Sequence, residues 1–478
     1  MPTATLDHLA DQAFTRVAGA PLVERNAVRL LRDGAGNYPA WLEAIGRATR
    51  WIHFECYVIH DDEVGERFAS ALSARAGAGV AVRVIYDWVG GFGTSRRFWR
   101  RMRAAGIDVR SFNPPGPGSP LGWVSRDHRK MLAVDGEVAF VAGLCVGRMW
   151  AGDPERGVEP WRDTGIEIRG PAVAEVERAF AGSWARCGPA LPEDEASSGP
   201  PAPAGEVALR VVATVPSRAP VFRLDQLIAA AARSSLWLTD AYFAGTAAYV
   251  DALRAAARDG VDVRLLVPGG SDIPWLRPVT QAGYRALLEA GVRVFEWNGS
   301  MLHAKTAVAD RRWARVGSTN LNLASWVGNY ELDVAIEDEV FASLMEAMYV
   351  DDLGHATEVV LSRRRIRREP LPLRPARVRA SGGSASRAAA GALRVGNALG
   401  AALTRRRVLG RSESGALLLV GLTLCVLAAI GAVWPRALAV PLVVLAAWQG
   451  IALLVRGART RWSRPFTRRR RAGTAGAR

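Results

Sequence analysis

One octapeptide pattern, H-x-K-x4-D, occurs twice in this 478-residue chain and constrains its fold more than any other feature. It appears first as His128, Lys130 and Asp135 and again as His303, Lys305 and Asp310. Lys130 and Lys305 are the only lysines among the 62 Lys and Arg residues. Arg does not replace Lys where a compact ammonium must meet a small anion. The two lysines therefore indicate two sites for a phosphate-sized anion, one in each copy of the repeated pattern.

The segments that precede the two motifs follow one repeated design. Each begins with a short apolar strand, at 51–57 and at 236–242, and continues with a helix, a buried strand, a second helix and a third strand. The motif comes next, as a β-hairpin that places His and Lys on the same face. Strands that alternate with helices indicate βαβ units. We therefore predict an α/β fold of two pseudo-twofold-related α/β/α lobes with mainly parallel mixed sheets.

Composition marks the expected domain boundaries. A stretch rich in Pro, Gly, Ser and Glu at 188–205 cannot form a core, so we expect it to link the two lobes. The first lobe then spans residues 1–187 and the second spans 206–362. A basic linker follows at 363–414, and a basic tail ends the chain at 456–478.

The C-terminal part of the chain differs in charge and hydropathy from the body. Residues 363–478 contain 24 Arg and two acidic residues, a net charge of +22, so the preceding body carries −6. Within this part, the uncharged segments Gly415–Trp434 and Ala437–Val455 each have about the 20 residues that span a bilayer. We predict a transmembrane helical hairpin at 415–455, with a buried helix pair as the alternative. Arginines flank both ends, which indicates that the body and the tail face the cytoplasm.

The four cysteines, Cys56, Cys145, Cys187 and Cys425, are scattered and have no metal-ligand spacing. This argues against a disulfide scaffold or a zinc site and fits a reducing compartment.

A duplicated lobe brings the two motifs together as one site with two imidazoles and two ammoniums. One neutral imidazole attacks phosphorus, and the other protonates the leaving alkoxide. The two lysines stabilise charge on the non-bridging oxygens of the transition state. A second alcohol, or water, then accepts the phosphoryl group. This phosphodiester chemistry requires no metal or other cofactor.

From about Asn26 to Leu361, the chain resembles the phospholipase D superfamily and, within it, the bacterial cardiolipin synthases. The resemblance rests on the duplicated motif and on two segments that follow the second copy, G-S-T-N at 317–320 and N-Y-E at 329–331. It implies phospholipase D-like lobes in which Ser318 and Asn320 hold the substrate phosphate.

The resemblance also implies which carboxylates orient the histidines. Glu331 is expected to hydrogen-bond the far nitrogen of His303 and fix its tautomer. In the first half, the segment W-R-D-T at 161–164 resembles the matching region, so Asp163 is expected to orient His128. Asp135 and Asp310 belong to the catalytic motif, although bracing of the hairpins is the role that we favour for them. Glu55 and Asp240 end equivalent first strands, and either a structural role or a site role fits them.

One position departs from the family pattern. The first half has Ala142-Gly143-Leu144-Cys145 where an Asn is expected at the last place. A thiol is a weak donor, so one phosphate contact is lost or is supplied by another group. A small core residue is the favoured interpretation of Cys145, with a catalytic nucleophile as the alternative.

These features predict a cardiolipin synthase-like phosphatidyltransferase. A phosphatidyl group from phosphatidylglycerol or another phospholipid is transferred to His128 with loss of glycerol, although the pseudo-symmetry allows His303 instead. The hydroxyl of a second phosphatidylglycerol, deprotonated by His303, then attacks and gives cardiolipin. We expect the enzyme at the bacterial inner membrane, on its anionic cytoplasmic surface.

Three other functions are compatible with these residues. A phospholipase D or phosphodiesterase uses the same residues with water as the acceptor. A nuclease of the superfamily is disfavoured because nucleic-acid-binding bodies are usually basic and this one is acidic. The third alternative is a membrane-anchored scaffold with a degenerate site, which Cys145 suggests.

Overall fold

The computed structural model describes residues 12–116, 124–196, 201–273, 276–361, 366–367 and 447–448. Its first half comprises β1 (Val23–Arg32), α2 (Asp33–Arg47), β2 (Trp51–Cys56), α3 (Glu63–Gly77), β3 (Ala81–Asp87), η1 (Gly90–Gly93), α4 (Arg96–Ala104), β4 (Asp108–Phe112), β5 (Lys130–Val134), β6 (Val138–Ala142), α5 (Arg148–Ala151), η3 (Pro154–Arg156), β7 (Thr164–Arg169), α6 (Val173–Cys187) and α7 (Glu193–Ala196). Its second half comprises β8 (Val207–Thr214), α8 (Pro220–Ala231), β9 (Ser235–Thr239), α9 (Ala247–Arg258), β10 (Asp262–Pro268), α10 (Leu276–Leu288), β11 (Arg293–Trp297), β12 (Thr306–Ala309), β13 (Trp313–Gly317), the π-helical turn η4 (Ala324–Gly328), β14 (Glu331–Glu337), α11 (Glu339–Gly354), β15 (Ala356–Leu361) and β16 (Ile366–Arg367).

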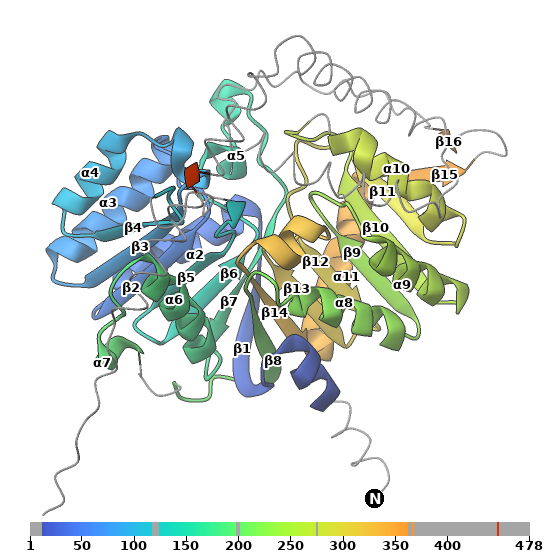
Figure 1. The fold of residues 1–478 in the computed structure, drawn as a ribbon, viewed down its shortest axis with the longest axis horizontal. Coiled ribbons are helices and arrows are strands. Elements are labelled where there is room, and N and C mark those ends of the chain that lie inside the picture. The colour runs from blue at the N-terminus through green and yellow to red at the C-terminus, as the bar shows by residue number, and fades with distance from the viewer. Residues whose placement is uncertain are drawn as a thin grey trace, which may run out of the picture. The chain divides into compact units, whose positions relative to one another are not determined.

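The described strands form one 16-stranded sheet whose order repeats about its centre. Strands β1 and β8 pair with each other at the middle (Figure 1), and each also pairs with a strand of its own half, β1 with β7 and β8 with β14. Outward from the centre the order is β7-β6-β5-β2-β3-β4 on one side and β14-β13-β12-β9-β10-β11 on the other. The internal repeat that the sequence predicts is therefore present in the order of the strands.

The prediction of mainly parallel sheets is wrong for the strands that the structure describes. Only β2–β3, β3–β4, β9–β10 and β10–β11 pair in parallel, and all the other strand pairs are antiparallel. The βαβ units produce the parallel pairs, as expected. The motif hairpins β5–β6 and β12–β13 are joined by tight turns, which require antiparallel pairing.

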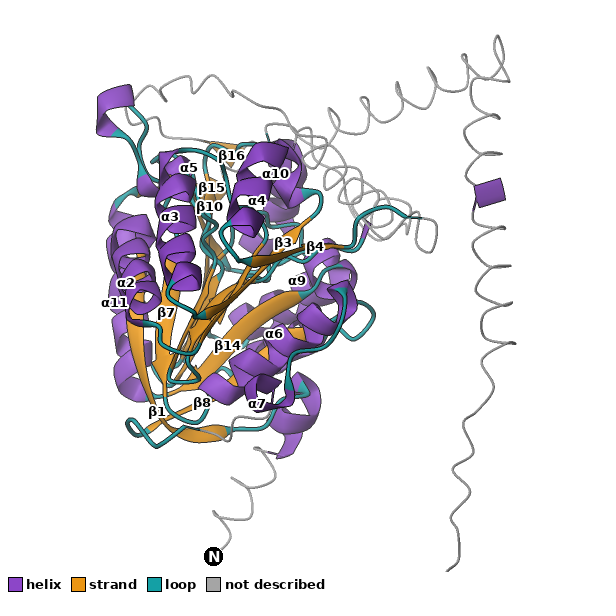
Figure 2. Ribbon diagram, turned by 90° about the vertical axis from the view of Figure 1, so that its left-hand side faces the viewer, coloured by secondary structure: helices purple, strands orange, loops and turns teal. Residues whose placement is uncertain are grey.

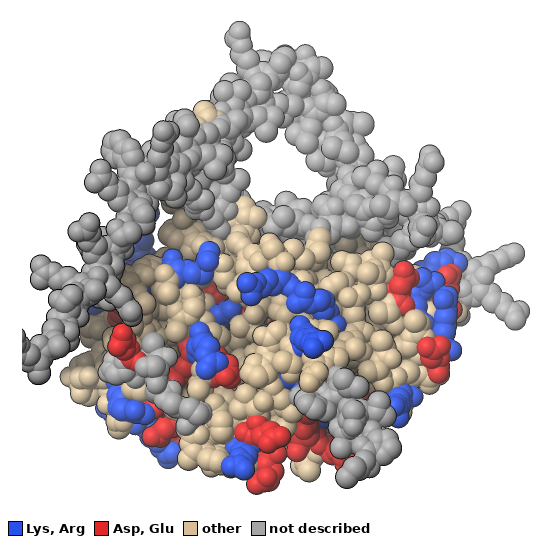
Figure 3. All heavy atoms as spheres, turned by 60° about the horizontal axis from the view of Figure 1, so that its bottom comes forward, with Lys and Arg blue, Asp and Glu red and all other residues tan. Residues whose placement is uncertain are grey.

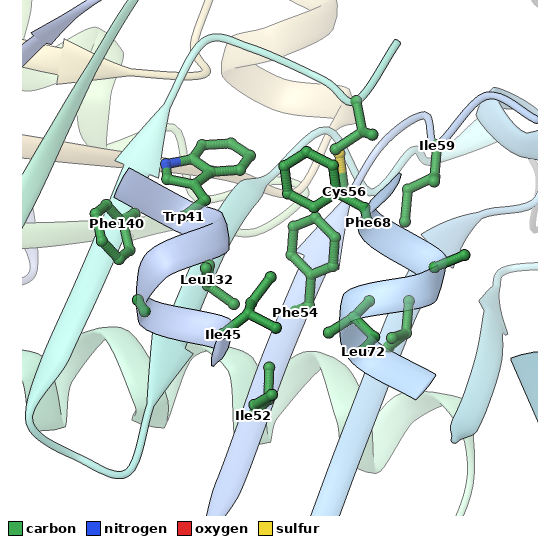
Figure 4. Close-up of a cluster of buried hydrophobic side chains, with 14 of the residues drawn as sticks. Trp41, Ile45, Ile52, Phe54, Cys56, Ile59, Phe68, Leu72, Leu132 and Phe140 are labelled. Atoms are coloured by element: carbon green, nitrogen blue, oxygen red, sulfur yellow. The ribbon is translucent and has the colours of Figure 1, made fainter. Parts of the chain in front are cut away.

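Helices cover both faces of the sheet (Figure 2). In the first half, α2 and α3 place Trp41 and Phe68 over Phe54 of β2, in the apolar cluster of Figure 4. The alternate residue of the same strand, His53, points to the other face and stacks on Phe180 of α6, with ring centroids 4.6 Å apart. Side chains of a strand alternate between faces, so both faces of β2 are buried under helices.

A central core joins the two halves. Strands β6 and β7 contact β13 and β14, and Phe180 of α6 shares one buried apolar cluster with Phe341 of α11. Val141 of β6 and Val334 of β14 are fully buried in this cluster. The two hairpins are therefore positioned against each other by a shared hydrophobic core.

The predicted transmembrane hairpin at 415–455 lies outside the described residues except for 447–448. Among the helices of the described part, none has both the length and the apolar character that crossing a bilayer requires. On the face of the body seen in Figure 3, basic and acidic side chains are interspersed.

Candidate active site

The Asp residue of each motif anchors its hairpin at the end remote from the histidine. The carboxylate of Asp135 accepts hydrogen bonds from the backbone N–H groups of Thr49, Arg50 and Trp51 at 2.7–2.8 Å and from Thr49 Oγ1 at 2.8 Å. Asp310 repeats this pattern with the backbone N–H groups of Arg233, Ser234 and Ser235 and with Ser234 Oγ.

Both aspartates adopt positive φ, 56° at Asp135 and 51° at Asp310, and so do the residues that follow them, Gly136 and Arg311, as in type I′ turns. Strand β5 separates Asp135 from Lys130, a length of about 17 Å at 3.3 Å per residue. The contacts of Asp135 and Asp310 fix the hairpins onto the starts of β2 and β9, and their place in the catalytic set stays a prediction. The bracing role that the sequence analysis favoured agrees with these contacts.

Each motif histidine is docked on the backbone of the opposite half. The N–H of His128 donates to the carbonyl of Tyr330 at 2.8 Å. The N–H of His303 donates to the carbonyl of Arg162 at 2.7 Å. These bonds belong to short parallel bridges, Asp127 with Tyr330 and Arg162 with Leu302. The two motifs therefore meet at one place, as the sequence predicts.

The docking determines which carboxylate holds each ring, and here the prediction is wrong. His128 Nδ1 lies 2.8 Å from Oε2 of Glu331, and His303 Nδ1 lies 2.7 Å from Oδ2 of Asp163. We predicted the opposite assignment, with each carboxylate serving the histidine of its own half. Glu331 directly follows Tyr330, whose carbonyl accepts from His128, and Asp163 directly follows Arg162, whose carbonyl accepts from His303. The backbone bridges therefore place each carboxylate beside the histidine of the opposite half.

Both lysines are buried beside the histidines. Lys130 is 0% exposed and Lys305 is 1% exposed. Lys130 Nζ donates to the carbonyl of His128, and Lys305 Nζ donates to the carbonyl of His303. Burial, together with the positive charge of Lys130, lowers the pKa of Lys305 to about 8. Two ammoniums that repel each other in a dry site favour an anion between them.

The surroundings of the two rings differ. Trp150, Trp161 and Tyr242 surround His303, with ring centroids 5.5–5.8 Å away. Burial and the charge of Lys305 lower the pKa of His303 to about 4, so the imidazole is neutral at pH 7 when no substrate is bound. The ring of Tyr57 lies beside His128, with the ring centroids 5.0 Å apart.

The two orienting carboxylates also differ. Burial raises the pKa of Glu331 to about 7. Burial alone would raise the pKa of Asp163, but the charges of His303 and Lys305 outweigh it and lower that pKa. The indole Nε1 of Trp150 donates to Asp163 at 3.2 Å and so helps to hold the carboxylate.

The residues expected to hold phosphate lie at the start of the turn after β13. Ser318 Oγ accepts from the N–H of Leu332 at 2.9 Å, which ties this turn to β14. Asn320 is 1% exposed, and its Oδ1 has no hydrogen-bond partner among the described residues. An amide contacts a phosphate oxygen through its Nδ2 donor, so the free acceptor does not itself indicate phosphate. Phosphate binding by Ser318 and Asn320 stays a prediction.

Glu55 lies near the end of β2, Asp240 directly follows β9, and both side chains are buried. Asp240 accepts from the N–H of Leu321 at 2.8 Å and of Tyr242 at 3.1 Å, and burial raises its pKa to about 7. Glu55 is fully buried, with Arg129 3.9 Å away. Because Asp240 bonds the backbone around the second motif, we assign it a structural role.

Sequence reasoning missed one buried ion pair that supports the site. Arg162 donates to both carboxylate oxygens of Asp352 in α11 at 2.8 Å. Arg162 lies beside Asp163 in the chain, so the pair fixes the segment that orients His303. Only the docking of α11 reveals this contact, and no local sequence pattern marks it.

Comparisons with known proteins identify the family of this chain. The family profile described as "Cardiolipin synthase, PLD-like domain" matches residues 224–352. Cardiolipin synthase A of Pseudomonas aeruginosa is 36% identical over 375 residues, which cover 77% of this chain and 75% of that protein. The chain belongs to the cardiolipin synthase family of the phospholipase D superfamily. A second member of the family, cardiolipin synthase 1 of Bacillus anthracis, is 30% identical over 369 residues, or 74% of this chain and 71% of the relative.

The fold is also similar to that of a solved structure. The crystal structure of phosphatidylserine synthase from Haemophilus influenzae Rd KW20 superimposes with a TM-score of 0.59. The match covers 73% of this chain and 91% of the other at 12% sequence identity. At 12% sequence identity, the similarity shows that the two proteins share a fold.

Proposed function

We propose that this protein is a phosphatidyltransferase that makes cardiolipin from two phosphatidylglycerol molecules. One observation carries the proposal: each motif histidine is held at Nδ1 by a carboxylate of the opposite half. Because a carboxylate of the opposite half holds Nδ1, we assign the chemistry to Nε2 of each imidazole, and either histidine requires both halves. Membership of the cardiolipin synthase family supports the lipid substrates.

The proposed reaction has two steps. Nε2 of His128 attacks the phosphorus of phosphatidylglycerol, and the departing glycerol takes a proton from His303. The hydroxyl of a second phosphatidylglycerol then loses its proton to His303 and attacks the phosphohistidine, which releases cardiolipin and free His128. Lys130 and Lys305 bind the non-bridging oxygens in both steps, where preorganised charge stabilises the transition state.

The proton that His303 must supply depends on the bound substrate. Without substrate, burial and the charges of Lys305 and Lys130 lower the pKa of His303. A phosphodiester anion between the ammoniums offsets their charge, so the pKa of His303 rises when substrate binds. Substrate binding therefore loads His303 with the proton that the leaving glycerol needs.

We further propose that the two halves act as pseudo-twofold-related lobes attached to a bacterial inner membrane by residues 415–455. The two uncharged segments in this range have the length of a bilayer, and arginines flank both. The active body and the basic tail then lie at the anionic cytoplasmic surface, where the phospholipid substrate is located. Protease protection of a tag placed after Arg478 in sealed inverted membrane vesicles would contradict this orientation.

Product analysis of purified full-length protein on phosphatidylglycerol vesicles tests the proposal. We expect cardiolipin and glycerol in a one-to-one ratio, and loss of both in His128→Ala and His303→Ala proteins. His355→Ala is the matched control, because His355 is exposed at the end of α11 and outside the site. Phosphatidic acid without cardiolipin would instead identify a hydrolase with water as acceptor.

A further inference from the structure

A basic helix and an exposed phenylalanine lie together on the outer flank of the first half (Figure 1). Helix α4 has the sequence R-R-F-W-R-R-M-R-A, in which five of nine residues are arginine and none is acidic. All five arginines are exposed, and its apolar side chains are buried. The turn η1, G-G-F-G, lies just before the helix, and its Phe92 is 61% exposed. We call Phe92 with Arg96, Arg97 and Arg100 the basic rim.

The basic rim begins at the same edge of the sheet as the motif histidines. Strands β2 and β3 are parallel, so the segments that follow them leave the sheet at one edge. Strand β5 starts beside the end of β2, two residues after His128, so His128 lies at this edge too. Asp87, at the end of β3, accepts from the N–H of Asp127 at 2.8 Å and from the N–H of Gly90 at 2.9 Å. One carboxylate therefore holds both the start of η1 and the residue before His128.

The turn that carries Phe92 packs closely on the body. A Cβ added at Gly90 would lie 2.0 Å from the carbonyl oxygen of Tyr57, and a Cβ added at Gly91 would lie 2.4 Å from the ring of Tyr86. Because glycine has no Cβ, it permits this close approach. The backbone of the turn is therefore fixed against the body, while the ring of Phe92 stays outside it.

Three arginines of the basic rim have no ion-pair partner in the part of the chain that the structure describes. Arg101 of the same helix pairs with Glu66, but Arg96, Arg97 and Arg100 have no such contact. Arg96 and Arg97 also occupy the first turn of α4, where the helix dipole disfavours positive charge. Neither an ion pair nor the dipole accounts for these side chains, so the stability of the helix does not explain them.

The second half repeats the helix without its charge. Helix α10 follows β10 as α4 follows β3, and its thirteen residues contain two arginines. The repeated framework therefore requires a helix at this place and not an arginine-rich one. On the face drawn in Figure 3, basic side chains are instead interspersed with acidic ones.

We propose that the basic rim binds an anionic phospholipid surface and holds the active site against it. Arginines bind phosphate oxygens through paired N–H donors, and clustered arginines are attracted to the negative potential of such a surface. A single exposed phenylalanine is ordinary, but one that lies beside unpaired arginines can enter the boundary between headgroups and acyl chains. Helix α4 itself does not insert, because its apolar face is buried in the body.

The effect on transfer rests on the proposed function. The proposed membrane segments at 415–455 tether the body, whereas the basic rim orients it. A body held at the headgroups by Phe92 and three arginines presents His128 to the lipid phosphates. Loss of the basic rim should therefore lower transfer on a bilayer and leave the chemistry on a dissolved lipid unchanged.

Photocrosslinking of the full-length protein in phosphatidylglycerol vesicles tests the contact. One protein carries p-benzoyl-phenylalanine in place of Phe92, and the matched control carries it in place of Val340. Val340 is 73% exposed and lies in the first turn of α11, beyond the end of β14 that is remote from Glu331. After irradiation and trypsin digestion, we expect on the order of tenfold more lipid on the peptide 84–96 than at position 340. Vesicles of phosphatidylcholine should lower the adduct at position 92 by about fivefold or more.

Transfer rates test the orientation of the site. Arg96→Gln combined with Arg97→Gln and Arg100→Gln should lower the rate on phosphatidylglycerol vesicles by about tenfold or more. The same variant should change the rate by less than about twofold on dihexanoyl phosphatidylglycerol dissolved below its micelle concentration. A control variant removes the same charge from the opposite edge of the sheet and should keep both rates. It carries Gln at three exposed positions before the starts of β1, β2 and β10, namely Arg16, Arg47 and Arg258.

Three results would overturn the proposal. The first is an adduct at position 92 that is no stronger than the adduct at position 340 or that does not depend on lipid charge; the basic rim would then serve a partner of another class. The second is a triple variant that keeps its rate on vesicles, and the third is one that loses both rates equally. The adduct does not depend on catalysis. A protein that gives the lipid adduct but makes no cardiolipin from either substrate would therefore refute the proposed function and leave the lipid contact established.

Discussion

The crossed pairing of carboxylates and histidines predicts a specific energetic coupling. Asp163 and His303 are 0% and 4% exposed, and a 2.7 Å hydrogen bond joins them across the two halves. A buried hydrogen bond to a charged group contributes about 1.5–3 kcal/mol. In a double-mutant cycle of Asp163→Asn and His303→Ala, we expect a coupling free energy of this size. The cycle of Asp163→Asn with His128→Ala should give less than about 0.5 kcal/mol, as expected for residues that share no bond.

Urea unfolding of the full-length protein, followed by tryptophan fluorescence, measures both cycles without any need for activity. The mirror-related pair extends the test: Glu331→Gln should couple to His128→Ala and not to His303→Ala, because Glu331 lies 2.8 Å from His128. Coupling of Asp163 to His128 that equals or exceeds its coupling to His303 would refute the crossed arrangement. It would support the pairing within each half that the sequence suggested.

Three further predictions concern the remaining parts of the site. Lys130→Arg and Lys305→Arg should each lower kcat for transfer by on the order of 10²- to 10³-fold, because a buried ammonium at each position supplies charge to the transition state and a guanidinium does not fit; activity near that of the wild type would contradict this. Asp135→Ala should lower the free energy of unfolding by about 2–4 kcal/mol in a urea titration, since three backbone donors and one hydroxyl lose their acceptor. Backbone donors lower the pKa of Asp135 despite its burial, so this loss should be full above about pH 4 and should vanish as the pH falls through the lowered pKa; a loss that persists in acid would argue against the carboxylate as its source. The pKa of Lys305 is about 8, so kcat/KM should fall as the pH rises through that value and the ammonium loses its charge; a pH profile that stays flat to pH 10 would show that Lys305 keeps an ordinary pKa.

The sequence predicted the repeat, the motif hairpins and the convergence of the two histidines, because these depend on local pattern. The spacing from His128 to Asp135 and from His303 to Asp310 defines two hairpins of one length, and tight turns follow from it. The parallel pairs β2–β3 and β9–β10 also follow from alternating strands and helices. These features required no knowledge of how the halves dock.

The features that depend on docking were not predictable in this way. Glu331 reaches His128 only because Tyr330 bonds the backbone of the opposite half, and nothing near Glu331 in the chain indicates this. The central strands β1 and β8 were likewise missed, since their pairing joins segments far apart in the sequence. The expected linker is also more structured than its composition suggests: Glu195 is buried and pairs with Arg83.

The central claim is that both halves complete one reaction centre and that one histidine carries the lipid. Rapid mixing of the full-length protein with phosphatidylglycerol, labelled in the free glycerol headgroup and in the acyl chains, followed by quenching in cold, mildly alkaline detergent, tests it directly. We predict a burst of one glycerol per chain, matched by one acid-labile, protein-bound phosphatidyl group on His128. Two bound groups per chain would show that each half reacts independently. Glycerol release with no bound lipid would contradict the phosphohistidine and, with it, the composite site.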